Sequence, residues 1–309
     1  MKVSPRVMDK LNTTERSMYK LWIDVDNDDI WVYFCLVILM GIIKKPFYHM
    51  YWSTDCVLST PIFSRLMRRD RFEQIRSMMR FTDPLNESSG SLNKLSYFLN
   101  HLSYQFKTNY IPGEYIAVDE FLSKWKGRLH FKQYIPSKRD RYGVKIYMCC
   151  ESNTGYLWRF IIYTGADTIY KEPNINVQLL KPFNDYTGPS KVVLSLIDGM
   201  YNQGYKVVLD NLYTSPELFR VLLENGTDAF GTLRRKYGLP PDFWDWKPPK
   251  LYLTSLPPIV QYCGNIMACR WNDCYKSKKT KIVSMLSTKH TGDLVGSGKM
   301  HYASKRKKL

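Results

Sequence analysis

The first 110 residues carry apolar positions that recur every three or four residues, the period of helices with one buried face. Phe72, Ile75, Met78 and Met79 follow Asp70 at this spacing. We therefore predict a mostly helical N-terminal region. The expected helices lie at residues 27–45, with Asn27 or Asp28 as the cap, after Thr60-Pro61, from Asp70 onward, and at residues 95–106.

Short apolar runs between turn residues replace this pattern after Pro112-Gly113, and such runs are typical of strands. Ser215-Pro216-Glu217 has the order of a helix start, with a cap, a proline and an early carboxylate. We expect strands at residues 115–118, 144–150, 157–163, 205–209, 229–232, 266–271 and 281–287, and helices at 192–200 and from 215 to a stop at Asn225-Gly226.

Together these elements predict an α+β fold, in which a helical region precedes a mixed sheet. Residues 240–258 are rich in Pro and Trp, which indicates an insertion or a linker. The chain ends in a basic tail, where Lys305-Arg306-Lys307-Lys308 is either a nuclear-import patch or a solvated end.

The longest apolar run, residues 30–43, spans about 14 residues and is shorter than the roughly 20 that cross a bilayer. We expect a buried helix there. The seven cysteines are odd in number and include no CxxC pair, which favours reduced thiols in an intracellular protein.

Charge narrows the class of partner. The sequence has 45 Lys and Arg against 28 Asp and Glu, a formal charge of +17. Such a surplus indicates a polyanion or, less often, an anionic membrane surface. The 23 Tyr, 8 Trp and 14 Phe favour nucleic acid, because aromatic rings stack on bases beside phosphate contacts.

Two aspartates, Asp119 and Asp210, each follow an apolar strand run. Strand ends at the carboxyl edge of a sheet are common places for ligands and metals. Two carboxylates on adjacent strands repel unless a cation lies between them, and their oxygens suit Mg²⁺. A pair of such ions is the usual device for attacking a phosphodiester. The alternative is that both aspartates only end strands or cap helices.

The densest basic stretch comes directly after Asp119, and Trp125, Phe131, Tyr134 and Tyr142 are interleaved with it. Cations mixed with aromatic rings suit a nucleic-acid backbone held beside a metal site, whereas a solvated surface would carry more acids than Asp140 alone. The predicted DNA-binding residues are Lys124, Lys126, Arg128, Lys132, Lys138, Arg139, Arg141 and Lys145.

A zinc site is the other metal alternative, with Cys263, Cys269, Cys274 and His290 as potential ligands. Their spacing fits no familiar zinc module, so core or incidental thiols are the favoured interpretation.

Ordered blocks of the chain resemble piggyBac transposases and their domesticated relatives. Residues 115–165 hold the first block and residues 207–236 the second. The matching residues of the two blocks include Asp119-Glu120, Gly127-Arg128, Gln133 to Lys138, Gly143-Val144-Lys145, Thr154-Gly155-Tyr156 and Tyr163-Thr164-Gly165, then Asp210-Asn211, Tyr213-Thr214-Ser215 and Gly231-Thr232. Shorter matches are Arg69 to Phe72, Arg80-Phe81, Arg270 to Asp273 and Leu286 to His290.

The resemblance implies a helical region for dimerisation and DNA binding, followed by an RNase H-like catalytic domain that an insertion domain interrupts. It places the helical region at residues 1–110, the first part of the catalytic domain at 111–238, the insertion domain at 239–295 and the basic tail at 296–309. Such enzymes cut and rejoin double-stranded DNA at TTAA-type sites through a hairpin intermediate. Three aspartates hold two Mg²⁺ ions; the first matches Asp119 and the second Asp210.

The third aspartate of the family has no match in these 309 residues. Asp273 falls within the insertion-domain match, and Asp198 and Asp293 lack the matching context. We therefore expect an incomplete two-ion site and impaired strand cleavage.

The function expected is that of a nuclear, piggyBac-like protein that binds double-stranded DNA. A homodimer is compatible with the sequence, and we expect neither a membrane partner nor a small-molecule substrate. The alternatives are a non-catalytic DNA-binding protein of transposase origin and an unrelated basic scaffold or membrane-surface protein.

Overall fold

The computed structural model describes residues 22–79, 81, 90–174, 176–235, 239–246, 259–274 and 280–293. The chain separates into two compact units, Met1–Leu99 and Asn100–Leu309. The domain boundaries expected at residues 110, 238 and 295 stay predictions. The basic tail lies outside the described residues.

The first unit is helical, as expected. Its elements are α2 (Asn27–Ile42), a 3₁₀ helix (Tyr48–Trp52), α3 (Pro61–Leu66) and α4 (Arg69–Met78). Aromatic side chains join them, because Phe63 and Phe72 are fully buried and both pack against the ring of Trp52. The cap of α2 differs from the prediction: Asp26, one residue earlier, accepts a hydrogen bond from the backbone N–H of Asp29.

Helix α2 is not the buried helix that its apolar sequence predicts. It buries Tyr33 and Leu36, whereas Trp31, Ile38 and Ile42 are exposed. The prediction was wrong because a sequence that is apolar on every side does not show which side is packed. No helix among the described residues is both long and apolar enough to cross a bilayer.

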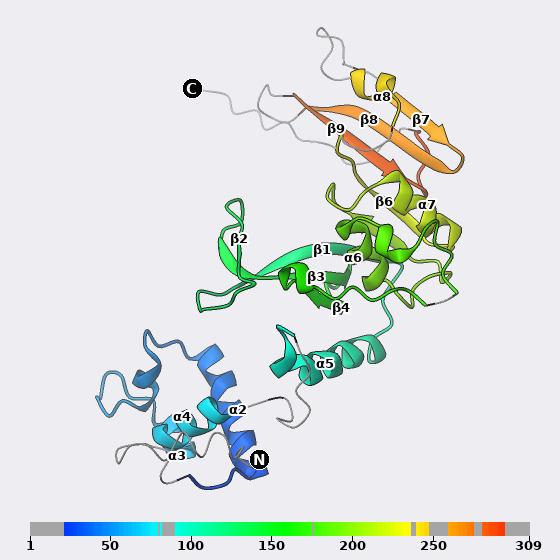
Figure 1. The fold of residues 1–309 in the computed structure, drawn as a ribbon. Coiled ribbons are helices and arrows are strands. Elements are labelled where there is room, and N and C mark those ends of the chain that lie inside the picture. The colour runs from blue at the N-terminus through cyan, green and yellow to red at the C-terminus, as the bar shows by residue number, and fades with distance from the viewer. Residues whose placement is uncertain are drawn as a thin grey trace, which may run out of the picture. The chain divides into compact units, whose positions relative to one another are not determined.

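The second unit is built on a mixed sheet, which Figure 1 shows in green to orange. Strands β1 (Tyr115–Lys124), β3 (Tyr142–Glu151) and β4 (Leu157–Ile162) are antiparallel neighbours. Strands β5 (Lys206–Leu209) and β6 (Asp228–Thr232) continue the sheet parallel to β1. The mixed sheet with its helices confirms the expected α+β fold class, and the strand order, with helices before β5 and β6, is consistent with an RNase H-like domain.

Two helices cover buried strand residues of this unit. Helix α6 (Gly188–Leu196) begins four residues earlier than predicted and contributes Val193, and α7 (Pro216–Glu224) contributes Leu218 and Phe219. Ser215 caps α7 as the sequence predicts, because its hydroxyl accepts the backbone N–H of Leu218. Helix α5 (Ser96–Thr108) precedes the sheet, and short 3₁₀ turns lie at Asn93–Leu95, Gly165–Asp167 and Phe183–Asp185.

Beyond the end of β1 the chain forms a projection that carries β2 (Gln133–Tyr134) and returns into β3. We call residues 124–142 the basic arm. In Figure 1 the arm lies at the end of the β1–β3 ribbon that points away from β6. Strand β2 was not predicted, since its two residues are too short to show a pattern.

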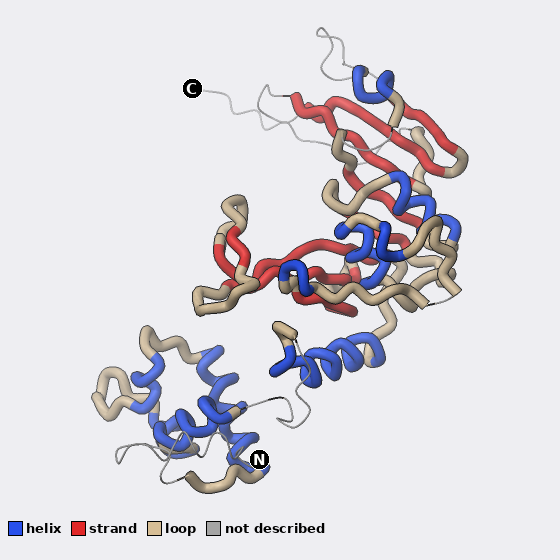
Figure 2. Tube along the Cα trace, viewed as in Figure 1, coloured by secondary structure: helices blue, strands red, loops and turns tan. Residues whose placement is uncertain are grey.

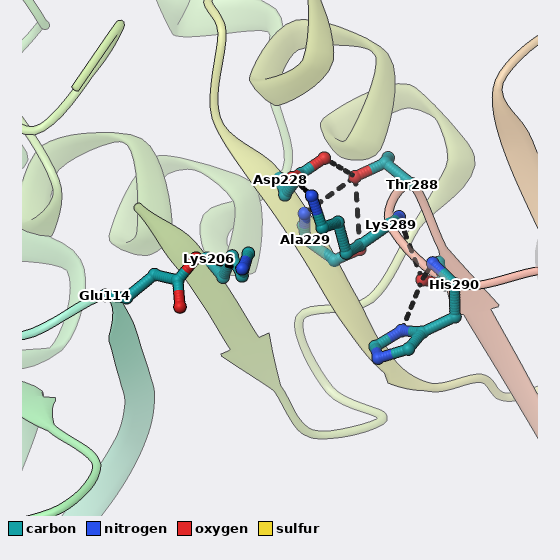
Figure 3. A network of polar contacts seen from close by, with 8 residues as sticks. Glu114, Lys206, Asp228, Ala229, Thr288, Lys289 and His290 are labelled. Atoms are coloured by element: carbon teal, nitrogen blue, oxygen red, sulfur yellow. Dashed lines mark hydrogen bonds and ion pairs between the residues drawn. The ribbon is translucent and has the colours of Figure 1, made fainter. Parts of the chain in front are cut away.

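The remaining strands extend the same sheet, whose strands are drawn in red in Figure 2. Helix α8 (Pro241–Asp245) precedes β7 (Ile259–Cys263), β8 (Ile266–Cys274) and β9 (Thr280–Ser287). Strand β9 pairs with β6, and polar contacts fasten the end of β9 to the same strand (Figure 3). Thr288 exchanges hydrogen bonds of 2.9 and 2.8 Å with Ala229, and its hydroxyl also donates to Asp228.

Candidate metal and nucleic-acid site

Asp119 lies on β1, and Asp210 directly follows the neighbouring parallel strand β5, at the equivalent position in the register. Val118 of β1 pairs with Leu209 of β5, and each aspartate is the next residue along its chain. Val118 and Leu209 are buried and both aspartates are exposed. Because side chains alternate along a strand, the carboxylate of Asp119 projects from the side of β1 opposite to buried Val118.

The strand limits differ from those predicted around Asp119. Strand β1 continues to Lys124, paired with β3 throughout, so Asp119 lies within a strand and not at its end. Only the parallel pairing with β5 stops at Val118. Asp210 therefore follows the end of β5 at the level where β1 continues through Asp119.

Backbone donors orient both carboxylates. One oxygen of Asp119 accepts the N–H of Glu120 at 2.7 Å, and one oxygen of Asp210 accepts the N–H of Leu212 at 2.7 Å. The main-chain oxygen of Asp210 also accepts the hydroxyl of Thr214 at 2.9 Å. Thr214 is fully buried, so this contact holds the Asp210 loop against the sheet.

A hydrogen bond between side chains joins the two aspartate segments. The hydroxyl of Tyr213 donates to Glu120 at 3.1 Å, which connects the loop after Asp210 with the residue after Asp119. Burial, followed by the charge of Glu120, raises the pKa of Tyr213, so its hydroxyl stays protonated and can donate. Sequence reasoning missed this contact, although both residues belong to the matching blocks, because they are far apart in the chain.

Cys150 is a further neighbour that the sequence did not single out. It lies on β3 opposite Ala117, two residues before Asp119. Burial, followed by the charge of Asp119, raises the pKa of the Cys150 thiol. A neutral thiol thus lies near Asp119.

The donor set fits part of a divalent-metal site. Carboxylate oxygens are hard ligands that suit Mg²⁺. Among the described residues, however, no group of three or more His, Cys, Asp or Glu side chains comes together in a way that could hold a metal ion. This applies equally to Cys263, Cys269 and His290, the described side chains of the zinc alternative.

Asp198, one of the aspartates considered as a third ligand, is committed elsewhere. It is 2% exposed and forms ion pairs with Arg159 at 3.5 Å and Lys171 at 3.6 Å. Its second oxygen accepts the backbone N–H of Asn174. These partners neutralise the carboxylate inside the protein, so Asp198 belongs to the packing of the unit.

Most of the predicted DNA-binding residues share the basic arm. Lys124 pairs with Asp140 at 3.0 Å, and Lys132 donates to the main-chain oxygen of Gly127 at 3.2 Å. The other arm cations, which are exposed, are Lys126, Arg128, Lys138, Arg139 and Arg141. The arm continues directly from β1, the strand that carries Asp119.

Exposed rings accompany these cations. Trp125, Tyr134 and Tyr142 are each about half exposed, and the last two rings lie 4.7 Å apart between centroids. Phe131 is buried instead and belongs to the support of the arm. Lys145 is separate from the other cations: it lies farther along β3, beside Tyr147 and Tyr163.

The fold and the blocks that form the site are those of the transposase class of proteins. The family model described as Transposase IS4 matches residues 3–308. Because this match spans nearly the whole chain, the protein belongs to that family, and it is of the piggyBac type.

Curated relatives are human proteins derived from piggyBac elements. PiggyBac transposable element-derived protein 3 is 29% identical over 243 residues, covering 77% of this chain and 39% of the relative. PiggyBac transposable element-derived protein 2 is 26% identical over 243 residues, which again cover 77% of this chain and 39% of the relative. The chain thus spans about two fifths of the length of these relatives.

A solved structure shares the fold. The cryo-EM structure of a piggyBac transposase synaptic complex with hairpin DNA superposes with a TM-score of 0.73 at 22% identity. The superposition covers 94% of this chain and 57% of that one.

Proposed function

We propose that this protein binds double-stranded DNA, with the basic arm on the phosphate backbone and the Asp119–Asp210 pair beside it. One observation carries the proposal: the strand that presents Asp119 runs on without a break into the basic arm. A backbone held by the arm therefore passes near the carboxylates. The solved relative is a complex with hairpin DNA, which supports this class of partner.

Mg²⁺ is the proposed cofactor, since DDE transposases generally use divalent metal ions. Asp119 and Asp210 would hold it, and it would supply charge stabilisation for attack on a phosphodiester. A two-ion site needs further ligands, and the described residues bring no third carboxylate to the pair. We therefore propose that strand cleavage is impaired in this polypeptide of 309 residues, and that DNA binding is the activity it retains.

The activity of piggyBac transposases supplies the remaining details of the proposal. The DNA is of the transposon-end or TTAA-target type, the protein acts in the nucleus, and two copies assemble on the DNA. A non-catalytic DNA-binding protein of transposase origin is the second candidate, and the absence of a third ligand among the described residues favours it.

Salt-dependent DNA binding tests the arm. Each phosphate contact makes the slope of log K against log salt more negative by about 0.9. Replacing two exposed arm cations, as Lys126→Met with Arg128→Met, should weaken binding and make this slope less negative by roughly 1 to 2. Fluorescence anisotropy with a duplex of about 20 base pairs at several salt concentrations measures both quantities.

The matched control removes the same charge elsewhere in the second unit, as Lys191→Met with Lys281→Met. It should lower the net charge equally and change the slope by much less. Equal slopes for the arm variant and the control would mean that the whole surface, and not the arm, attracts DNA. Binding that does not vary with salt would contradict the proposed function itself.

A further inference from the structure

An open cavity of about 600 Å³ lies beside Tyr213. Tyr213 also bonds to Glu120, whose side chain projects from β1 on the side opposite to Asp119. The cavity therefore lies on the other face of β1 from Asp119, and it adjoins the Asp210 loop, because its lining includes Leu212, whose N–H donates to Asp210. The residues that line the cavity include Lys145, Tyr147, Tyr163 and Tyr170.

Lys145 is the cation of this cavity. Its ammonium lies 4.7 Å from the ring centre of Tyr147 and 5.8 Å from that of Tyr163. Within the described part of the chain it forms no ion pair with a carboxylate, unlike Lys124 on the arm. A lysine held by two rings in this way remains available to an anion.

Tyrosine rings form the walls. The rings of Tyr147 and Tyr163 lie 6.0 Å apart at an angle of 80°, so the cavity is lined by ring surfaces in two orientations. Burial raises the pKa of Tyr147 and of Tyr170, whose hydroxyls also interact with each other. Both stay neutral, so Lys145 is the charged group among the lining residues.

We propose that this cavity binds one nucleotide unit, with its base against the tyrosine rings and its phosphate on Lys145. Aromatic side chains stack on any base, and a lysine beside them neutralises the phosphate. A cavity of about 600 Å³ is in the range of small-ligand sites and is too small for a duplex. A base can enter only when it is unpaired or turned out of the stack.

If the bound nucleotide is part of DNA, the cavity rests on the proposed function and makes it more specific. A free mononucleotide carries the same base and phosphate, so the cavity should also bind it without DNA. Binding of the two ligands therefore distinguishes failure of the cavity proposal from failure of the proposed function.

Paired and bulged DNA test the first form. The intact 309-residue chain should bind a duplex with one unpaired thymidine about tenfold more tightly than the fully paired duplex. Lys145→Met and Tyr163→Leu should each reduce that preference to nearly onefold. Tyr163→Phe, which keeps the ring, should preserve it, and retained binding of the fully paired duplex by the other two variants shows that they are folded. Lys126→Met on the arm should weaken both DNAs alike and leave the ratio unchanged.

Thymidine monophosphate and inorganic phosphate test the second form. Saturable binding of the nucleotide, measured by NMR line broadening and lost in Tyr163→Leu, supports the cavity even if the protein binds no DNA. Equal competition by inorganic phosphate would overturn the role of the rings. Equal affinity for bulged and paired DNA, with no binding of the nucleotide, would overturn the proposal and leave the function of the arm intact.

Discussion

Gly231 determines how closely β6 approaches the loop that carries Asp210. It pairs with Leu209, the residue before Asp210. A Cβ atom at this position would overlap the main-chain oxygen of Leu209 and would lie 2.5 Å from the hydroxyl oxygen of Thr214. Thr214 is the side chain that holds the main-chain oxygen of Asp210. The glycine thus leaves room for the contact that positions the carboxylate.

Gly231→Ala should therefore lower the free energy of unfolding by about 1–3 kcal/mol, the usual cost of overpacking. Gly188→Ala is the matched control, since nothing lies within 4 Å of the added atom. Its effect should stay within about 0.5 kcal/mol. Urea unfolding of the two variants measures the difference, and similar losses in both would exclude the steric explanation.

At the level of elements, α4 is joined to the start of α2 by one side chain. Arg71 donates to the main-chain oxygens of Ile23 and Asp24, at 2.7 and 3.3 Å, and pairs with Asp29. The arginine and its aspartate are both mostly buried. Since one guanidinium satisfies three acceptors, the packing of the two helices depends on it.

Arg71→Met should destabilise the first unit by about 2–3 kcal/mol, because it removes charged hydrogen bonds and leaves Asp29 without its partner. Arg69 on the same helix is half exposed and pairs with Glu73 at 3.5 Å. Arg69→Met should therefore cost roughly 0.5 kcal/mol or less. Thermal unfolding followed by circular dichroism compares the two, and a larger loss for Arg69→Met would reverse this assignment.

Strand β1 shows why element boundaries differ from the sequence pattern. Its apolar run stops at Val118, so the sequence predicts four residues. The observed strand has ten, because pairing with β3 uses backbone groups and does not require apolar side chains. The polar residues in its second half are those that the proposed function uses.

For the whole molecule, the two units have separate cores. One buried cluster contains Leu36, Phe63 and Phe72, and the other extends from Ile116 to Leu286. The carboxylate pair, the basic arm and the tyrosine cavity all belong to the second unit. Catalytic competence is then a question of whether the polypeptide supplies another carboxylate to that unit.

An assay of DNA strand cleavage tests whether the catalytic site of the whole polypeptide is impaired. With Mg²⁺ and a TTAA-flanked DNA end, this 309-residue polypeptide should nick no faster than its Asp119→Ala variant, because two carboxylates do not complete a two-ion site. A piggyBac transposase that cleaves this DNA end is the positive control. Nicking by this chain that disappears in Asp119→Ala would show an active enzyme and contradict the proposed impairment.

Local chemistry alone determined much of this protein. The helical and strand-rich parts, the cap at Ser215, the two aspartates and the run of cations can be read from neighbouring residues, since propensity, capping and charge act over a few positions. The motif Leu286 to His290 could also be recognised in the sequence, but its structural role could not. In the structure, Thr288 of this motif fastens the end of β9 to Asp228 and Ala229 of β6.

The tertiary structure decided which distant residues meet. It placed Tyr213 on Glu120, neutralised Asp198 with Arg159, and moved Lys145 away from the arm into a tyrosine cavity. None of these contacts has a local signal, because each depends on how strands pair and which faces are buried. Sequence spacing measures distance along the chain, whereas chemistry at a site depends on distance in space.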